Sequence, residues 1–131
     1  ARSYLNEAKL SLERAEKNFK DNDLLWATIV AYYAEYYALY SFLQAIGVKC
    51  ENHFCSIFTV SFLLGEDKTK TINQHKNKRI DAQYYMKVGK GGQVDQMVKE
   101  AKVFVSAFDE IVSGLNEEDI NSYRKSLMKP R

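Results

Sequence analysis

Proline is almost missing from this chain of 131 residues: the single copy is Pro130, next to the C-terminus. Since proline interrupts helices, its scarcity allows long helices along the whole chain. Glycine, the other residue that breaks regular structure, occurs only at positions 47, 65, 89, 91, 92 and 114. We expect these glycines to separate helices.

A strong excess of charge is also lacking. The 19 basic and 17 acidic residues leave a formal net charge of +2, so any nucleic-acid function has to rest on local clusters. Cysteine is scarce, with two copies, and the N-terminus has no signal-peptide pattern. These features predict a reducing, cytoplasmic setting, and the length suits one domain over residues 1–131.

Charge is scarcest in residues 23–47, around which we expect the fold to be organised. Few polar residues interrupt the apolar and aromatic run from Leu24 to Ile46, namely Thr28, Glu35, Ser41 and Gln44. Five of the nine tyrosines lie here: Tyr32, Tyr33, Tyr36, Tyr37 and Tyr40. A run this long, with alanines and without glycine or proline, predicts a helix. Its apolar residues cover nearly the whole circumference, so other helices of this chain, or a second subunit, have to cover it.

The same run is long enough to cross a membrane. Glu35 lies at its centre, however, and the tyrosines are spread along its length instead of gathering at two membrane interfaces. Buried phenol groups also need hydrogen-bond partners, which lipid does not supply. These observations favour a buried central helix.

Apolar residues recur every three or four positions in most of the remaining chain, as on one face of a helix. This spacing predicts helices over residues 2–20, 53–64 and 94–115, a looser one from about Thr71, and a short one from Glu117. Residues 56–62 are rich in β-branched and aromatic side chains, so a short strand is the alternative there. No other segment would pair with such a strand. We therefore predict an all-α, up-and-down helical bundle of four to five main helices plus a short C-terminal helix.

Candidate metal ligands are few. Cys50, His53, Cys55 and His75 are four possible zinc ligands, but their spacing is not that of a usual zinc knuckle. We interpret them as two partly buried thiols and histidines, with His53 near the helix start that Asn52 caps. No Ser-His-Asp pattern or complete phosphate-binding glycine loop is present in the sequence, and no metal or cofactor is indicated.

Basic residues gather before and around position 79: Lys68, Lys70, Lys76, Lys78 and Arg79. A flexible basic loop, with glycines at 89, 91 and 92 and lysines at 87 and 90, follows them. Together these features are compatible with phosphate contacts, and a solvated helix face is the alternative.

A cluster of charge and phenol begins at Arg79 and continues with Asp81, Tyr84 and Tyr85 on two neighbouring helix faces. A guanidinium can bind a phosphate through two hydrogen bonds, and tyrosines stack on bases. From spacing alone, an ion pair with two aromatic residues that fill the core is the favoured alternative.

With these residues in view, the chain resembles a HEPN domain of the small stand-alone prokaryotic branch, often encoded beside a minimal nucleotidyltransferase. Five landmarks follow one another over residues 3–115: Ala31-Tyr32-Tyr33-Ala34, Gly47, His53, the segment Arg79-Ile80-Asp81-Ala82-Gln83-Tyr84 (similar to R-x-x-A-D-Y) and Ala101 with Phe104-Val105 (similar to A-x-x-F-V). The resemblance implies a helical bundle that is commonly a homodimer with a cleft across its interface. Many relatives are metal-independent ribonucleases in which Arg and His of an R-x4–6-H motif assist transfer of the RNA 2′-oxygen to phosphorus.

The chain departs from that motif at the histidine, because the expected positions hold Tyr84, Tyr85 and Met86. Tyrosine is a poor proton donor or acceptor at neutral pH. The resemblance therefore implies a nucleotide- or RNA-binding domain with a degenerate catalytic motif, acting with a nucleotidyltransferase in a toxin–antitoxin-like system. The alternatives are an active ribonuclease toxin with an altered site and a non-catalytic dimerisation module.

The resemblance and the charge pattern together indicate the residues of the expected site. We expect Arg79 to anchor a phosphate, Tyr84 to stack or donate a hydrogen bond, and Lys78 to add charge. Asp81, Tyr85 and His53 complete the predicted nucleotide- or RNA-binding set.

Overall fold

The computed structural model describes residues 2–128, and these residues form helices and no strand. Six α-helices follow one another: α1 Arg2–Lys20, α2 Leu24–Ala45, α3 His53–Leu64, α4 Lys70–Tyr85, α5 Gly91–Ser113 and α6 Glu117–Met128, with a 3₁₀ turn, η1 Glu66–Lys68, before α4. The predicted all-α helical bundle is confirmed. The strand alternative for residues 56–62 is wrong, because these residues lie inside α3.

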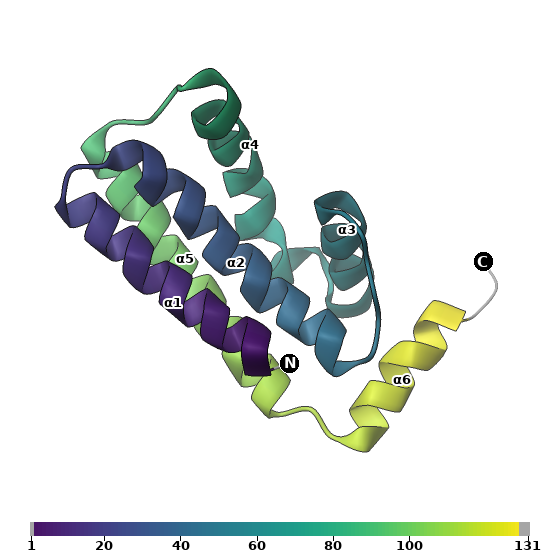
Figure 1. The fold of residues 1–131 in the computed structure, drawn as a ribbon. Coiled ribbons are helices and arrows are strands. Elements are labelled where there is room, and N and C mark those ends of the chain that lie inside the picture. The colour runs from purple at the N-terminus through teal and green to yellow at the C-terminus, as the bar shows by residue number, and fades with distance from the viewer. Residues whose placement is uncertain (1, 129–131) are drawn as a thin grey trace.

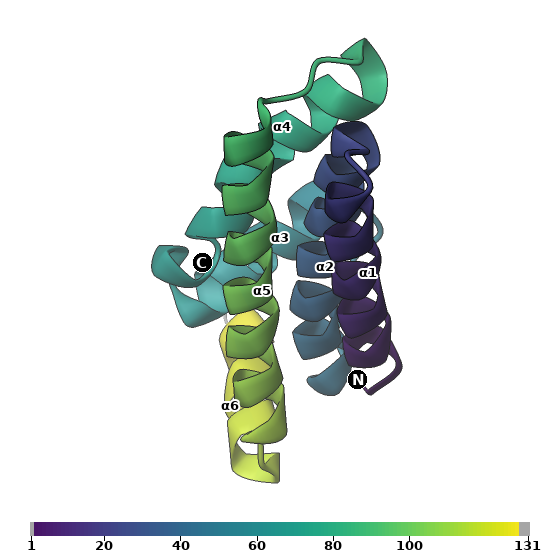
Figure 2. The same ribbon diagram turned by 90° about the vertical axis from the view of Figure 1, so that its left-hand side faces the viewer.

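Helix α2 is the centre of the fold, as its apolar circumference predicted. It packs against α1, α3, α4 and α5. In Figure 1, α1 and α5 run alongside α2, whereas α3 and α4 lie toward its other side; Figure 2 shows α1, α2 and α5 nearly parallel. Four fully buried alanines form a stripe along α2 and let its neighbours approach closely: Ala27, Ala31, Ala34 and Ala38. Helices of this same chain therefore supply most of the cover that α2 needs.

A glycine ends α2 where the sequence predicted one. Gly47 has a φ of +75°, a left-handed conformation that favours glycine. The N–H of Gly47 donates to the carbonyl of Gln44 at 3.1 Å, and that of Val48 donates to the carbonyl of Leu43 at 2.9 Å. These two bonds form a Schellman motif and turn the chain toward α3.

The start of α5 differs from the prediction. Gly91 and Gly92 lie in its first turn and not in a flexible loop, so the loop after α4 is limited to residues 86–90. The N–H of Lys90 donates to Oε1 of Gln93 at 2.9 Å. This contact caps the helix in spite of its two glycines.

Helix α6 projects from the bundle in Figure 1. It is held by the ring of Tyr123, whose centroid lies 5.2 Å from that of Phe42, and by Arg124, whose Nη1 donates to the carbonyl of Ile46 at 2.8 Å. Within residues 2–128, no helix has the length and apolar character needed to cross a membrane.

Candidate functional site

The first turn of α3 is held on α2 by two tyrosines one helical turn apart. The hydroxyl of Tyr36 shares a hydrogen bond of 2.9 Å with Oγ of Ser56, and the hydroxyl of Tyr32 lies 3.1 Å from Nδ1 of His53. Asn52 caps α3, as predicted, so His53 is the first residue of the helix. Two of the five phenols that the sequence placed in a buried helix thus have partners, and these contacts hold His53 over α2.

Aromatic rings enclose His53. Its imidazole stacks on the ring of Tyr36, with centroids 3.8 Å apart and planes inclined by 17°. Burial lowers the pKa of His53 below its ordinary value, and the positive charges of Arg79 and Lys76 lower it further. His53 is therefore a neutral imidazole at neutral pH, which is able to accept a proton.

Arg79 of α4 packs on Tyr32, the tyrosine whose hydroxyl contacts His53. Its guanidinium carbon lies 4.9 Å from the ring centroid of Tyr32 and 5.8 Å from that of Tyr33, and the residue is only 8% exposed. Nη1 donates to Oε1 of Gln83 at 3.2 Å, whereas Nε has no hydrogen-bond partner in the described part of the chain. Among residues 2–128, no carboxylate lies within ion-pair distance of Arg79. This buried cation has an unused donor and no neutralising charge.

We call the group of Tyr32, Tyr33, His53, Lys76 and Arg79 the Arg79 site. Burial raises the pKa of Tyr32 to about 12, although the positive charge of Arg79 opposes the shift, so its phenol stays protonated. A protonated phenol, a neutral imidazole and two cations give the site a net positive charge. Such a set suits an anion with several oxygen acceptors, as a phosphate has.

A small groove of about 130 Å³ lies between α3 and α4 and shares Lys76 with the Arg79 site. The ammonium group of Lys76 lies 6.0 Å from the ring centroid of Phe54, which in turn stacks on Phe58. Phe54 is 69% exposed. Its open ring surface, beside a cation, is suited to a planar ligand such as a base.

A second polar cluster is buried one turn before Arg79 on α4. Nδ1 of His75 lies 2.8 Å from Oε2 of Glu35, and its Nε2 lies 2.9 Å from Oε1 of Glu100. Burial raises the pKa of Glu35 to about 7, partly opposed by His75. Burial alone would lower the pKa of His75, but its bonds to the two glutamates and their charges outweigh burial, so the pKa is raised. Both ring nitrogens are occupied, so His75 has none left for a ligand.

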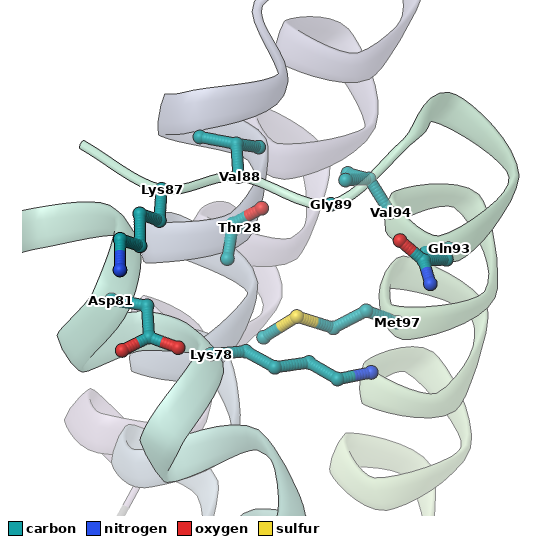
Figure 3. A pocket seen from close by; sticks show the side chains of 9 residues that line it. All are labelled: Thr28, Lys78, Asp81, Lys87, Val88, Gly89, Gln93, Val94 and Met97. Atoms are coloured by element: carbon teal, nitrogen blue, oxygen red, sulfur yellow. The ribbon is translucent and has the colours of Figure 1, made fainter. Parts of the chain in front are cut away.

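The geometry of α4 separates residues that lie close in the sequence. At about 100° per residue, Lys78 and Asp81 project from a different side of the helix than Arg79. They line a cavity of about 280 Å³ between α4, α5 and the loop that joins them. Figure 3 shows Lys78, Asp81 and Lys87 around this cavity, together with Thr28 and Met97. We call it the Lys78 cavity.

The remaining predicted residues lie at the end of α4. Tyr84 and Tyr85 are both well exposed there, at 64% and 66%. Of the five residues predicted to accompany Arg79, the structure therefore brings His53 to it, from another helix. The other four lie on α4, away from the side chains that enclose the guanidinium.

A family model described as HEPN domain matches residues 1–112. This chain belongs to the HEPN domain family. Its members are generally concerned with nucleotides or RNA, which agrees with a cationic site that has an unused donor. No curated protein matches the chain.

In this HEPN domain, Tyr32, Tyr33 and Lys76 of the site, and Gln83 beside it, were not in the set of ligand-binding residues that the sequence predicted. The rings of Tyr32 and Tyr33 contact both His53 and the guanidinium of Arg79. Lys76 stands three residues before Arg79, and Gln83 stands four residues after it. The signals were present, because the Tyr32-Tyr33 pair is one of the family landmarks and Lys76 belongs to the basic cluster. Only the packing of α4 on α2 unites them.

The four possible zinc ligands do not form one site in this HEPN domain. Within the described part of the chain, no group of three or more His, Cys, Asp or Glu side chains is placed to hold a metal ion. His75 is bound between two glutamates. Nδ1 of His53 is bound to the hydroxyl of Tyr32.

Proposed function

We propose that this HEPN domain binds phosphate groups of RNA or of a nucleotide at the Arg79 site. The observation that carries the proposal is the state of Arg79: it is buried on two aromatic rings, and the described residues supply neither a carboxylate for its charge nor a hydrogen-bond partner for its Nε. A buried charge without a counter-ion is costly, and an entering phosphate would supply both the charge and the missing acceptor. The guanidinium is already oriented, so little entropy is lost on binding.

The surroundings of Arg79 support RNA in particular. Lys76 adds a second cation to the Arg79 site, and the exposed ring of Phe54 is available for stacking with a base of the same RNA strand. The Lys78 cavity has cations of its own, but Asp81 lies among them and offsets part of their charge. The Arg79 site therefore has the more favourable electrostatics for an anion.

Single variants distinguish binding at the Arg79 site from binding at the Lys78 cavity. We expect Arg79→Ala to weaken binding of a short single-stranded RNA about ten- to hundredfold, because charge-assisted hydrogen bonds contribute about 1.5–3 kcal/mol. Lys78→Ala should change binding by a much smaller factor. The measurement is fluorescence anisotropy in EDTA at two salt concentrations, and binding should be weaker at the higher one.

Lys99→Ala is the matched control for a lost surface charge, because Lys99 is exposed and pairs with Asp95 within α5. Circular dichroism melting of each variant checks that the fold is retained. Strong loss of binding in Lys78→Ala together with wild-type affinity in Arg79→Ala would move the site to the Lys78 cavity. Arg79→Lys, which keeps the charge but lacks the forked donors, should fall between wild type and Arg79→Ala.

A second candidate function, metal-independent RNA cleavage, is favoured by the place of His53. The ribonuclease motif lacks its histidine after Arg79, but α3 supplies a neutral imidazole across Tyr32 from the guanidinium. In this hypothesis His53 accepts the proton of the 2′-hydroxyl while Arg79 holds the phosphate. The same RNA incubated in EDTA tests it: cleavage should vanish in both His53→Gln and Arg79→Ala, whereas binding should survive in His53→Gln.

The partners are also part of the proposal. The resemblance to the small stand-alone branch supports a cytoplasmic homodimer that acts with a minimal nucleotidyltransferase in a toxin–antitoxin-like pair. Because α1, α3, α4 and α5 already cover α2, a dimer would bury little of α2 beyond its partly exposed tyrosines. Light scattering coupled to gel filtration measures the assembly, and a monomer at high concentration would contradict it.

A further inference from the structure

The two cysteines of the chain lie in contact. Cys50 is in the connection between α2 and α3, and Cys55 is in the first turn of α3. Both are free thiols, and the Sγ of Cys55 donates to the Sγ of Cys50 at 2.6 Å. A disulfide bond is about 2.0 Å long, so a small rotation of the side chains would bring the sulfurs to bonding distance.

The backbone around both cysteines is held by side chains of α2 and of the helix cap. The hydroxyl of Tyr40 donates to the carbonyl of Cys50 at 3.1 Å and lies 3.4 Å from its N–H. The N–H of Cys55 donates to the side chain of Asn52 at 2.8 Å. These contacts hold the backbone at Cys50 and at Cys55, and so they keep the two sulfur atoms close together.

The two thiols differ in their access to solvent. Cys55 is partly exposed, whereas Cys50 is buried, and burial raises the pKa of the Cys50 thiol. A small oxidant would consequently meet Cys55 first. Cys50 then lies beside the modified sulfur, where it can complete an exchange.

We propose that Cys50 and Cys55 are a redox modification site that forms a reversible intrachain disulfide by exchange with a small-molecule disulfide such as oxidised glutathione. The Cys55 thiolate attacks one sulfur of that molecule and releases its first thiol. The Cys50 thiolate then attacks the Cys55 sulfur of the mixed disulfide and releases the second thiol. One small disulfide is reduced to two thiols, which carry the protons lost by the two protein thiols.

The new bond would close a short loop that contains His53. That loop starts at Cys50, which Tyr40 binds, and ends at Cys55 in the first turn of α3. It therefore fixes the cap of the helix and its first residue. His75 lies outside the loop, on α4. Formation of the disulfide therefore changes the surroundings of His53 in the Arg79 site and leaves those of His75 unchanged. In a reducing compartment such a pair is oxidised transiently, as in a redox sensor.

The first experiment measures the chemistry on the full chain under native conditions. The protein is equilibrated with mixtures of reduced and oxidised glutathione, treated with an alkylating reagent, and weighed by intact mass spectrometry. We expect the oxidised chain to lose two hydrogens and take no label, and reduced glutathione to reverse this. The Cys50→Ser variant should stop at a glutathione adduct on Cys55, and Cys55→Ser should react far more slowly.

Three results would overturn the proposal: a wild-type adduct that never closes, full labelling of both thiols at every ratio, or disulfides between chains. The second measurement is the imidazole NMR spectrum, which is simple because the chain has two histidines. Signals of His53 should shift on oxidation while those of His75 remain. Unchanged His53 signals in the oxidised protein would disprove the connection to the site.

Discussion

Aromatic rings and an amide hold Arg79 in position, and no carboxylate among residues 2–128 does so. This difference decides what the residue can do. An arginine already paired with Asp or Glu has its charge neutralised and its fork of donors occupied. On Tyr32 and Tyr33, the guanidinium keeps its charge, and the ring faces attract it without using its hydrogen atoms. The same packing thus stabilises the fold and leaves a phosphate-binding group available.

At the same scale, two exposed aromatic residues compete for the role of base-stacking group. The sequence indicated Tyr84, whereas the structure places Phe54 beside Lys76 and the Arg79 site. Their exposed fractions are similar, 69% for Phe54 and 64% for Tyr84, so each alanine variant is a control for the other. We expect Phe54→Ala to weaken single-stranded RNA binding about five- to hundredfold, from a stacking contribution of about 1–3 kcal/mol, and Tyr84→Ala to leave it near wild type. The opposite ranking would return the stacking role to Tyr84.

Replacement of Glu35 by glutamine tests the buried pair of Glu35 and His75. The pKa of Glu35 is raised from 4.5 to about 7, and that of His75 is raised as well. Between about pH 5 and pH 8, the folded protein therefore binds more protons than the unfolded chain, and the pair's contribution to the free energy of unfolding falls as the pH rises. Urea unfolding should show wild type losing more stability than Glu35→Gln over this range.

Glu118→Gln is the control for that experiment, since it makes the same change in charge at an exposed position of α6. Its stability should follow the wild-type pH dependence. Parallel curves of stability against pH for wild type and Glu35→Gln would contradict the raised pKa values. They would mean that the pair titrates alike in the folded and the unfolded protein.

At the scale of the helices, glycines with positive φ set the ends of α2 and α3. Gly47 and Gly65 have φ values of +75° and +98°. A methyl group on Gly47 would also collide with Nη1 of Arg124, whereas nothing lies within 4 Å of one added at Gly65. We expect Gly65→Ala to cost about 1–2 kcal/mol of stability from backbone strain, and Gly47→Ala to cost about 0.5–1.5 kcal/mol more through the displaced hydrogen bonds of Arg124. Thermal and urea unfolding of both variants measure this difference.

Arg124→Ala provides the double-mutant cycle for Gly47. In its background, Gly47→Ala should cost no more than Gly65→Ala, because the obstructing side chain is gone. An unchanged extra cost would show that Gly47 is required for the Schellman turn alone and that α6 does not contribute to the end of α2.

The helices were the most predictable part of the molecule, because their signals are local. The apolar spacing of α1 predicted that helix, and the Asn52 cap and the glycines at 47 and 65 predicted three boundaries of α2 and α3 from neighbouring residues only. The site was less predictable, since Arg79 meets Tyr32 and His53 through contacts between helices. Lys78 stands next to Arg79 in the sequence, yet one residue of helix turns it toward another cavity. The start of α5 was missed because the cap formed by Gln93 compensates for two glycines.

At the scale of the whole molecule, α6 stands apart from the rest. The match to the HEPN model ends at residue 112, before α6 begins, and none of the described residues of α6 is fully buried. Its attachment consists mainly of Tyr123 on Phe42 and of Arg124 on the end of α2, with Ile120 partly buried against the core. The Arg79 site, by contrast, is made only by α2, α3 and α4. The bundle and its site should therefore be separable from α6.

A chain that ends at Leu115 tests this separation. We expect it to fold with the same helices and to lose about 1–3 kcal/mol of stability, because one aromatic pair and the hydrogen bonds of Arg124 disappear. Its affinity for single-stranded RNA and the NMR signals of His53 should match those of the full chain, since no residue of α6 contacts the site among those described. Circular dichroism, urea unfolding, anisotropy and the imidazole NMR spectrum measure these four quantities. An unfolded truncated chain would show that α6 belongs to the core, and a folded chain with weaker RNA binding would show that the ligand extends from Arg79 onto α6.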